Sequence, residues 1–563
     1  MSQLEKQIDQ LFARWDRPDS PGAALAVVRD GAIIYSRGYG MADLERGVPI
    51  TPGSVFDIAS TSKQFTAFVV LLLVHEGKVG LDEDIRTYLP EMPEYGRPIT
   101  VRHLLHHTSG IRDYLDLMEL AGMSWEYDYD EQELVDLLAR QKKLNFRPGE
   151  EHRYSNSNYF LLAEIIRRAS GQTLGELARE RIFEPLGMAA TRFYDDYTAI
   201  VPNRAIGYTR RKEGGYAIAL FKFDVLGDGG VLTSVEDMAR WDANFYDNRL
   251  EGGAELLAQM LTVGTLNDSA PSVPEELPEA DAAPDDRSAD DRRGAQGAQL
   301  DYAGGLVVDH YRGLPMVHHA GGWAGYSAEL IRFPEQRLSV VCLSNLDEVP
   351  CPELARQVAG LYLAAEMEPA EHADRSAVEL PEETLAAYTG AYRSQSSGTV
   401  YRLALEEGHL AFRHPQGFSV ALVPLGADRF HTAAGGWIAF AAEFEPAEPG
   451  QPRRFLLTPE QGNPVTLQEI KLSALDAERL AEYAGRYYSS ELRVAYHFLV
   501  ADNKLCLRIG RYGPTEALEH VGGDSWQRQA ATLRFTRNRA DQVRGLAVQV
   551  GRGPGLRFRK RKG

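Results

Sequence analysis

The last third of the 563-residue chain contains an internal repeat, and this repeat restricts the fold more than any other feature of the sequence. Residues of the same type recur 95 positions apart, namely Tyr388 with Tyr483, Gly390 with Gly485, and Tyr392 with Tyr487. The string LGADRF at 425–430 recurs as VGGDSW at 521–526. Each copy opens with a short helical segment and continues as alternating strands. The repeat predicts two small antiparallel β-barrels of about 90 residues each, at 378–472 and 473–563.

The first part of the chain reads as strands at both ends with helices between them. Strands are predicted at 24–28, 33–35, 306–308, 329–333 and 338–344, and helices at 60–77, 132–142 and 158–169. The early hairpin turns at Asp30-Gly31, and the late hairpin turns at 334–336. This order predicts an α+β domain over 1–370, in which both hairpins share one antiparallel sheet and helices pack on it.

Charge and composition exclude several classes of function. The formal net charge is -19, whereas a nucleic-acid partner requires a basic surface. The one basic run, at 557–562, is interpreted as a solvated tail. The longest apolar run, 65–74, is too short to span a bilayer, so no membrane role is expected. The N-terminus lacks a signal-peptide pattern, and three cysteines without CxxC spacing predict neither a disulfide framework nor zinc. A cytoplasmic protein is expected.

Residues 265–300 differ in composition from the rest of the first domain. Eight acidic residues lie between Glu275 and Asp291, together with Pro, Ala and Ser and almost no apolar residues. Such a segment cannot bury enough apolar surface to fold, so it is predicted to be an acidic insertion without fixed structure.

Ser60 and Lys63 form the first candidate site. They are three positions apart at the start of the apolar helix, so their side chains share one helix face. A serine hydroxyl needs a base within reach, and a partly buried lysine at a helix N-terminus has a lowered pKa that favours the neutral amine. The alternative is a helix-capping serine followed by a surface lysine.

Two further motifs supply candidate partners for this pair. Tyr154 and Asn156 lie in the string RYSNSN before a predicted helix, where a tyrosine can transfer protons and an asparagine can contact a carbonyl group. A second match at 246–248 is interpreted as a decoy. His319, Gly321 and Gly322 lie where a strand is predicted to begin, and the Gly322 N–H is expected to bind an oxyanion together with that of Ser60.

The motifs SxxK, YxN and HxG, in this order, resemble those of the serine β-lactamase and penicillin-binding-protein superfamily, closest to its class C branch. Supporting strings are LLHHTSGIRDY at 104–114, EPLGM at 184–188 and GDGGVLTSVEDMARW at 227–241. The resemblance implies Ser60 as nucleophile, Lys63 as base, Tyr154 as proton shuttle, Asn156 as carbonyl contact and His319 in the third motif. It also implies an acyl-enzyme intermediate with no metal and no cofactor.

One departure from this pattern bears on the substrate. The β-lactamases of this group carry Lys-Thr-Gly where the chain has His-Ala-Gly at 319–321, and a histidine is mostly neutral at pH 7. The HxG motif followed by two barrels is similar to the architecture of the bacterial D-aminopeptidases. That similarity implies that a loop of the last barrel, 510–523, reaches the cleft, where Glu516 or Glu519 pairs with a substrate amine.

The sequence therefore favours a D-aminopeptidase-like serine hydrolase that acts on a small peptide or amide. A carboxylesterase that acts on a small ester is the alternative. A peptide- or β-lactam-binding protein without turnover is the alternative of another class. A second copy of the chain, in a homodimer, is the one protein partner expected.

Overall fold

A computed structural model provides the fold and its side-chain contacts. It describes residues 2–124, 129–211, 213–219, 222, 225–267, 300–369, 377–395, 397–406, 408–415, 419–432, 440–446, 450–459, 464–472, 475–550 and 555–561. The predicted acidic insertion therefore lies almost entirely outside the described residues. Among the described residues, no helix combines the length and apolarity that crossing a bilayer requires.

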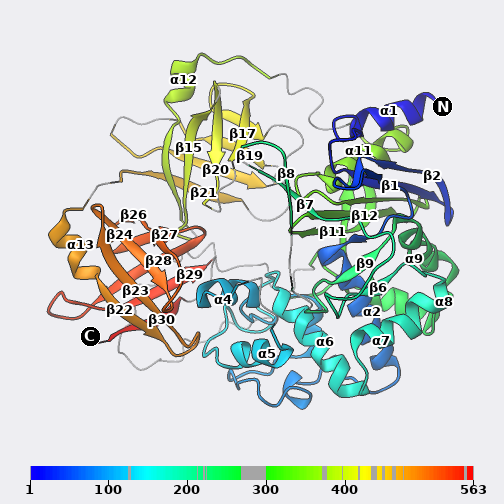
Figure 1. Cartoon of the computed structure of the whole chain (residues 1–563), viewed down its shortest axis with the longest axis horizontal. Coiled ribbons are helices and arrows are strands. Elements are labelled where there is room, and N and C mark those ends of the chain that lie inside the picture. Colours follow the sequence, from blue (N-terminus) through cyan, green and yellow to red (C-terminus); the bar gives the residue numbers. More distant parts are fainter. Residues whose placement is uncertain are drawn as a thin grey trace.

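The first part of the chain is built on one six-stranded antiparallel sheet, with strand order β10-β11-β12-β13-β1-β2 (Figure 1). Its strands are β1 (Ala23–Arg29), β2 (Ala32–Tyr39), β10 (Val307–Tyr311), β11 (Leu314–Trp323), β12 (Tyr326–Phe333) and β13 (Leu338–Ser344). β1 pairs with β13, for example Leu25 opposite Cys342. The early and late hairpins thus share one sheet, and this arrangement confirms the predicted α+β fold.

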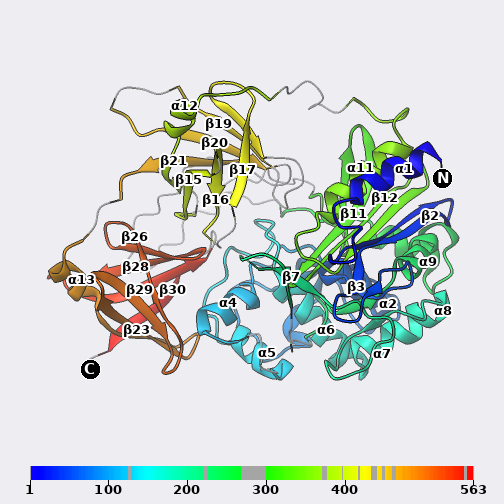
Figure 2. The same cartoon turned by 45° about the horizontal axis from the view of Figure 1, so that its top comes forward.

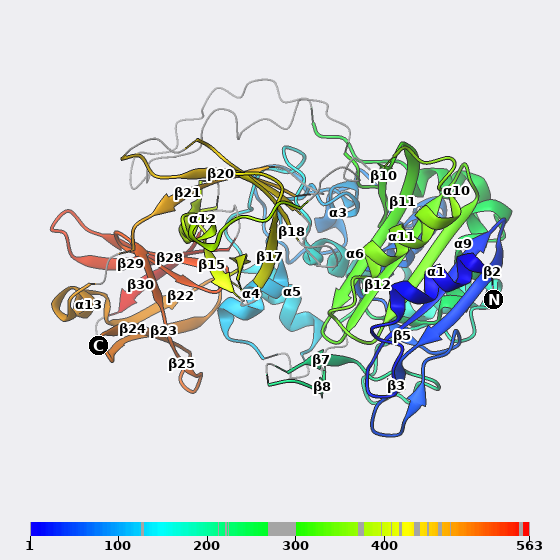
Figure 3. The same ribbon diagram turned by 90° about the horizontal axis from the view of Figure 1, so that it is seen from above.

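Helices cover both faces of this sheet because β1 is apolar on both faces. Leu25 and Val27 point into a cluster with helices α1 (Gln3–Phe12) and α11 (Cys351–Tyr362), which lie together on one face (Figure 3). Ala24 and Ala26 belong to the cluster on the opposite face. The helices on that side are α2 (Lys63–His75), α3 (Val101–Leu105), α4 (Tyr114–Ala121), α5 (Glu131–Ala139), α6 (Asn156–Ser170), α7 (Leu174–Ala178), α8 (Glu184–Leu186), α9 (Val235–Asp247) and α10 (Gly253–Met260).

Helix α2 is buried from Lys63 to Leu73. It begins at Lys63 and not at residue 60, because residues Ala59–Ser62 form a separate 3₁₀ turn, η1. It ends at His75, two residues before Gly77, whose φ of 70° lies in the left-handed region that glycine favours. The predicted helix 60–77 is therefore three residues too long at its N-terminus and two residues too long at its C-terminus.

Two β-units follow the helical layer, as the repeat predicts (Figure 1). The first is a closed barrel of β14 (Gly390–Ser394), β15 (Val400–Glu406), β16 (His409–Arg413), β17 (Ser419–Pro424), β18 (Arg429–Thr432), β19 (Phe440–Phe444), β20 (Arg454–Pro459) and β21 (Val465–Ile470). The second is a nine-stranded sheet of β22 (Gly485–Ser489), β23 (Val494–Ala501), β24 (Lys504–Ile509), β25 (Thr515–Ala517), β26 (Glu519–Gly522), β27 (Ser525–Arg528), β28 (Ala531–Arg537), β29 (Val543–Val550) and β30 (Leu556–Arg561).

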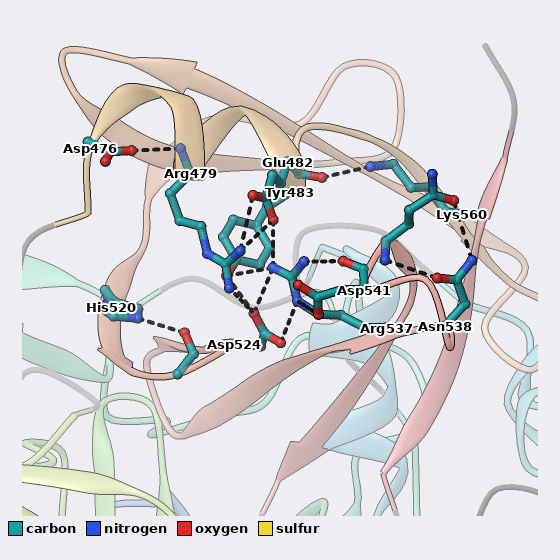
Figure 4. Close-up of polar contacts among 12 residues, drawn as sticks. Asp476, Arg479, Glu482, Tyr483, His520, Asp524, Arg537, Asn538, Asp541 and Lys560 are labelled. Atoms are coloured by element: carbon teal, nitrogen blue, oxygen red, sulfur yellow. Dashed lines mark hydrogen bonds and ion pairs between the residues drawn. The ribbon is translucent and has the colours of Figure 1, made fainter.

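The two units repeat the same internal hydrogen bonds. Tyr388 Oη donates to the Asp428 carboxylate at 3.0 Å, and Tyr483 Oη donates to the equivalent Asp524 at 2.5 Å (Figure 4). Four residues later, in the first strand of each unit, Tyr392 Oη donates to the Tyr388 carbonyl oxygen at 2.8 Å. Tyr487 Oη likewise donates to the Tyr483 carbonyl oxygen at 2.9 Å. The repeated Tyr, Tyr and Asp therefore recur because each unit uses them for the same contacts.

The basic run at the end of the chain was interpreted as a solvated tail, and this interpretation is wrong. Residues 556–561 form β30, which pairs with both β22 and β29. Leu556 and Phe558 are buried, whereas Arg557 and Arg559 point to solvent. The alternation places the apolar residues inside and the basic residues outside, so the charge of this segment masked an ordinary amphipathic strand.

Candidate active site

Ser60 lies in the η1 turn between strand β5 (Phe56–Asp57) and helix α2. The preceding residue, Ala59, has a φ of 46°, which is uncommon for a residue with a side chain. The Asp57 carboxylate accepts a hydrogen bond from the Ala59 N–H at 2.8 Å and stabilises this turn. A strained turn of this kind is a frequent feature of functional sites. It leaves Ser60 half-buried at the entrance to α2, whereas Thr61 and Ser62 are fully buried.

Lys63 lies directly against Ser60 in the interior of the protein. Its side chain is fully buried, and Nζ lies 2.9 Å from Ser60 Oγ. Nζ also donates to the Asn156 side-chain oxygen at 3.0 Å and to the main-chain oxygen of Asp228 at 2.6 Å. Three oxygen atoms from three separate segments therefore fix the position of the amine.

The environment of Lys63 changes its proton affinity. Burial lowers its pKa to about 8, and the nearby Asp228 and Asp113 carboxylates partly oppose this shift. Desolvation disfavours the charged ammonium, whereas opposite charges favour it. With a pKa of about 8, a substantial fraction of Lys63 is neutral near physiological pH. A neutral amine beside a serine hydroxyl can accept the hydroxyl proton.

Tyr154 lies beside both Ser60 and Lys63. Although 39% of the residue is exposed, burial of its phenol group raises the pKa well above the ordinary value, and a hydrogen bond with Ser60 acts in the opposite direction. Lys63 Nζ lies over the Tyr154 ring, 4.9 Å from its centroid. The phenol is therefore protonated at neutral pH, and Ser60 lies between one protonated donor and one amine base.

The His107 ring packs against the Tyr154 ring. The two ring centroids are 4.3 Å apart, and His107 Nδ1 accepts hydrogen bonds from the Ser155 N–H at 3.2 Å and from the Asn158 side chain at 3.0 Å. Because Nδ1 accepts both bonds, the ring proton is assigned to Nε2. Burial lowers the pKa of His107 well below its ordinary value, so its ring is neutral.

Asn156 is held by a carboxylate that the sequence motifs did not single out. Asp113 accepts from the Asn156 main-chain N–H at 2.6 Å and from its side-chain amide at 3.1 Å. Because Asp113 occupies the amide nitrogen, the side-chain oxygen of Asn156 is directed to Lys63. Asp113 also caps α4 through the Leu115 N–H at 2.8 Å. Burial raises the pKa of Asp113.

Asp228 is the second carboxylate beside Lys63. One of its oxygen atoms accepts a hydrogen bond from Tyr114 Oη at 3.0 Å, and the other is buried without a hydrogen-bond partner. Burial raises the pKa of Asp228 to about 6, while Lys63 acts in the opposite direction. The loop 227–230 therefore contributes both an oxygen atom and a negative charge to the surroundings of the lysine.

His319 lies within β11, and not at the beginning of a strand as the sequence suggested. Its Nδ1 donates to the carbonyl oxygen of Ala320 at 2.6 Å, and its Nε2 accepts from Tyr302 Oη at 3.1 Å. Burial, and next the charge of Lys63, lower the pKa of His319 to about 3. The ring is thus neutral and hydrogen-bonded on both sides, so it provides no fixed positive charge for a substrate carboxylate.

The glycines of the third motif, Gly321 and Gly322, allow β11 to approach the η1 turn that contains Ser60. A Cβ on Gly321 would lie 2.1 Å from the Ile58 carbonyl oxygen, which is closer than atoms can pack. Thr61 Oγ1 also donates to the main-chain oxygen of His319 at 3.1 Å, so η1 and β11 are directly linked. Gly322 follows on the exposed side of the strand. The main chain at 321–322 therefore lies beside the turn that carries Ser60.

The structure brings Ser60, Lys63, Tyr154 and Asn156 together but engages the two predicted glutamates elsewhere. Glu516 pairs with Arg528 at 2.8 Å, and Arg528 also contacts Glu119 in α4. Glu519 pairs with Arg402 of the first barrel. No hydrogen bond or ion pair among the described residues joins either glutamate to the Ser60 site, so their pairing with a substrate amine stays a prediction.

Sequence reasoning missed Asp113, Asp228 and Tyr302. The first two lie inside the strings LLHHTSGIRDY and GDGGVLTSVEDMARW, whose acidic residues could have been tested as partners of Lys63. Tyr302 lies two residues after the acidic insertion 265–300, and no motif marks it. The supporting strings could therefore have pointed to Asp113 and Asp228, whereas no sequence motif pointed to Tyr302.

Comparisons with known proteins identify a family for this chain. The "Beta-lactamase" family matches residues 4–363. The chain is 27% identical to a D-aminopeptidase of Gluconobacter oxydans over 87% of this chain and 83% of that protein. It is 31% identical to a D-aminopeptidase of Brucella anthropi, over 58% of this chain and 56% of that relative. The octameric penicillin-binding protein homologue of Pyrococcus abyssi has a similar fold, with a TM-score of 0.55, 24% identity, and coverage of 83% of this chain and 99% of that one.

Proposed function

Because the chain belongs to the beta-lactamase family, we propose that it is a D-aminopeptidase-like serine hydrolase that acts through an acyl-enzyme. The observation that carries the proposal is the 2.9 Å contact between the buried Lys63 amine and Ser60 Oγ. Burying a lysine costs free energy because the charged amine loses its hydration. Lysines whose pKa is lowered by burial, here to about 8, are therefore frequent at functional sites, and general base catalysis accounts for this one.

In the proposed acylation step, Ser60 Oγ attacks the carbonyl carbon of the substrate. The hydroxyl proton passes to neutral Lys63, and the carbonyl oxygen becomes an oxyanion. The main-chain N–H groups of Ser60 and Gly322 bind this oxyanion, and the close approach of β11 to η1 at Gly321 supports that role. Asn156, oriented by Asp113, keeps Lys63 directed at Ser60.

Tyr154 acts as the proton shuttle in this proposal. Its phenol is protonated, so it donates a proton to the leaving amine and regains one from the Lys63 ammonium. The C–N bond breaks, and the acyl group remains on Ser60 as an ester. A water molecule then attacks this ester, with Lys63 again the base, and the acid product leaves with Ser60 restored.

The substrate class follows from charge and from the relatives. His319 is neutral, so it provides no cation that would bind a substrate carboxylate. Asp113 and Asp228 instead give the region around Lys63 negative charge, which favours a substrate with a free amino group. Relatives named D-aminopeptidase support an N-terminal D-residue as the acyl group.

The compartment and assembly form part of the same proposal. The three cysteines are free and buried, which supports a reducing compartment such as the cytoplasm. We propose an assembly of several copies, either a dimer or a larger oligomer. An octameric homologue of similar fold supports the general idea of self-association.

The proposal is tested by turnover and by labelling. D-alanine anilide should be hydrolysed at least tenfold faster than its L form and faster than a short-chain nitrophenyl ester. A fluorophosphonate should add one mass increment at Ser60, and Ser60→Ala should remove both labelling and turnover. Ser36→Ala, on the exposed strand β2, is the matched control and should retain both. Preference for the ester would favour the carboxylesterase, and no turnover on any substrate would favour a binding protein.

A further inference from the structure

The second β-unit is in direct contact with the segment that organises the site. Figure 1 and Figure 2 both place α4 beside this unit. The turn between β22 and β23 carries Glu491, which is 8% exposed. Its carboxylate accepts hydrogen bonds from Arg112 Nη1 at 3.1 Å and from the Lys142 N–H at 2.9 Å. A buried carboxylate paired with a buried arginine is costly to form, so its placement calls for a reason.

Arg112, Asp113 and Tyr114 are consecutive and point to three different partners. Arg112 binds Glu491, Asp113 holds Asn156, and Tyr114 donates to Asp228 at 3.0 Å. Ser157 fixes the main chain of the same segment, because its hydroxyl donates to the Arg112 carbonyl oxygen at 2.7 Å and accepts from the Tyr114 N–H at 2.8 Å. The partners of Asp113 and Tyr114 both contact Lys63, through Asn156 Oδ1 and the Asp228 carbonyl oxygen.

The same unit also holds the other end of α4. Tyr496 Oη donates to the Leu120 carbonyl oxygen at 2.7 Å, and Ile509 packs against Gly122 at the end of the helix. Arg528 reaches Glu119 at 3.2 Å. The helix that begins with Asp113 as its N-cap is therefore fixed to the second β-unit at both ends.

We propose that Glu491 is a positioning residue for the reaction, which holds the Arg112–Tyr114 segment so that Asp113 and Tyr114 keep their partners in place around Lys63. The inference rests on the proposed function of Ser60 and Lys63 and extends it to a residue of the C-terminal unit. The unit acts through α4 and need not touch the substrate.

The first test compares Glu491→Gln with Glu482→Gln. Glu482 lies in the same unit, where it pairs with Arg479 and Arg537 (Figure 4). Rates are normalised to folded enzyme, measured by circular dichroism and by the final extent of fluorophosphonate labelling. Glu491→Gln should lower kcat about tenfold with KM within twofold, and should slow phosphonylation of Ser60 about tenfold. Glu482→Gln should leave all three within twofold. Unchanged normalised rates in Glu491→Gln would overturn the proposal.

A second pair decides the case in which Glu491→Gln does not fold. Tyr496→Phe removes the hydrogen bond to α4, and Tyr487→Phe removes an equivalent tyrosine–carbonyl bond inside the unit. Both tyrosines are buried, so the two changes match in chemistry and environment. Phosphonylation should slow about threefold in Tyr496→Phe and stay at the wild-type rate in Tyr487→Phe. Equal rates in both would overturn the proposal.

The readouts separate this inference from the proposed substrate. Phosphonylation of Ser60 depends on the nucleophile and its base and requires no D-amide. If wild-type protein is labelled at Ser60 but does not hydrolyse D-alanine anilide, the proposed substrate fails while the test of Glu491 remains valid. If wild-type protein is not labelled at Ser60, the proposed catalytic role of Ser60 fails first.

Discussion

The main-chain oxygen of Asp228 accepts a hydrogen bond from Lys63 Nζ at 2.6 Å, while the carboxylate of the same residue raises the pKa of Lys63 against the effect of burial. One residue therefore contributes to both the position and the charge state of the amine. The main-chain contact survives any substitution at this position, whereas the carboxylate can be removed. The two contributions can therefore be measured separately.

The pH dependence of wild-type activity should follow Lys63. Since the base must be neutral, kcat/KM should rise about tenfold per pH unit below the Lys63 pKa and level off near pH 8. The other ionisable groups around Lys63 are Asp113, Asp228, Tyr154, Tyr159, His107 and His319. Rates of hydrolysis between pH 5 and 10 measure the limb. A profile that falls between pH 6 and 8 would contradict a lysine base.

Asp228→Asn should shift this limb to lower pH. The negative charge of Asp228 raises the pKa of Lys63, so its removal lets burial lower that pKa below about 8. Asparagine is nearly the same size, and the main-chain contact to Nζ remains. Asp237→Asn, in α9, is a suitable control because Asp237 binds Thr191 and Arg240 away from the site. An unchanged or raised apparent pKa in Asp228→Asn would refute the electrostatic role.

Tyr154→Phe should lower kcat by about 10² to 10⁴, because the proton shuttle is lost while the ring packing on His107 remains. Steady-state kinetics on the best substrate measure the effect. The decoy motif provides the control, since Tyr246→Phe alters a tyrosine of the second YxN match at 246–248. Tyr246→Phe should leave kcat within twofold. Equal losses in both variants would argue against a specific role for Tyr154.

Gly321→Ala should impair the site through sterics alone. The added Cβ would lie 2.1 Å from the Ile58 carbonyl oxygen, so β11 and the η1 turn must separate. We expect a loss of about 1–3 kcal/mol in the free energy of unfolding and more than tenfold in kcat per folded molecule. Gly426→Ala, where a Cβ would meet nothing within 4 Å, should change the free energy of unfolding by less than about 1 kcal/mol. Urea unfolding and kinetics on both variants provide the comparison.

Local patterns predicted the fold and half of the site. The alternation of 24–28 and 338–344 predicted the strands that now pair in the central sheet, and the repeat predicted both β-units. Ser60 and Lys63 were found because their spacing on one helix face is a local property. Tyr154 and Asn156 were found because they occur as a short motif next to a predicted helix.

The remaining site residues depend on contacts that no local pattern encodes. Asp113 and Asp228 meet Lys63 only after three segments have packed together. Glu491 requires the docking of a separate unit onto Arg112. The start of α2 was misplaced because the positive φ of Ala59 is set by the tertiary structure around the turn and not by the alanine itself. Sequence spacing therefore identified the proposed nucleophile and base, but not the residues that surround them.

The buried apolar cluster that runs from α2 through α4 into β28 and β29 makes the C-terminal unit part of the same interior. A fragment that ends at residue 369 would expose to solvent the apolar side chains of α4 that the second β-unit covers. We expect this fragment to aggregate before its activity can be assayed. For the same reason, the domain that contains α2 and α4 and the second β-unit should unfold in a single cooperative step when the whole chain is heated. The second β-unit is thus part of the same hydrophobic core as the catalytic domain. The first effect of its removal would be a loss of solubility.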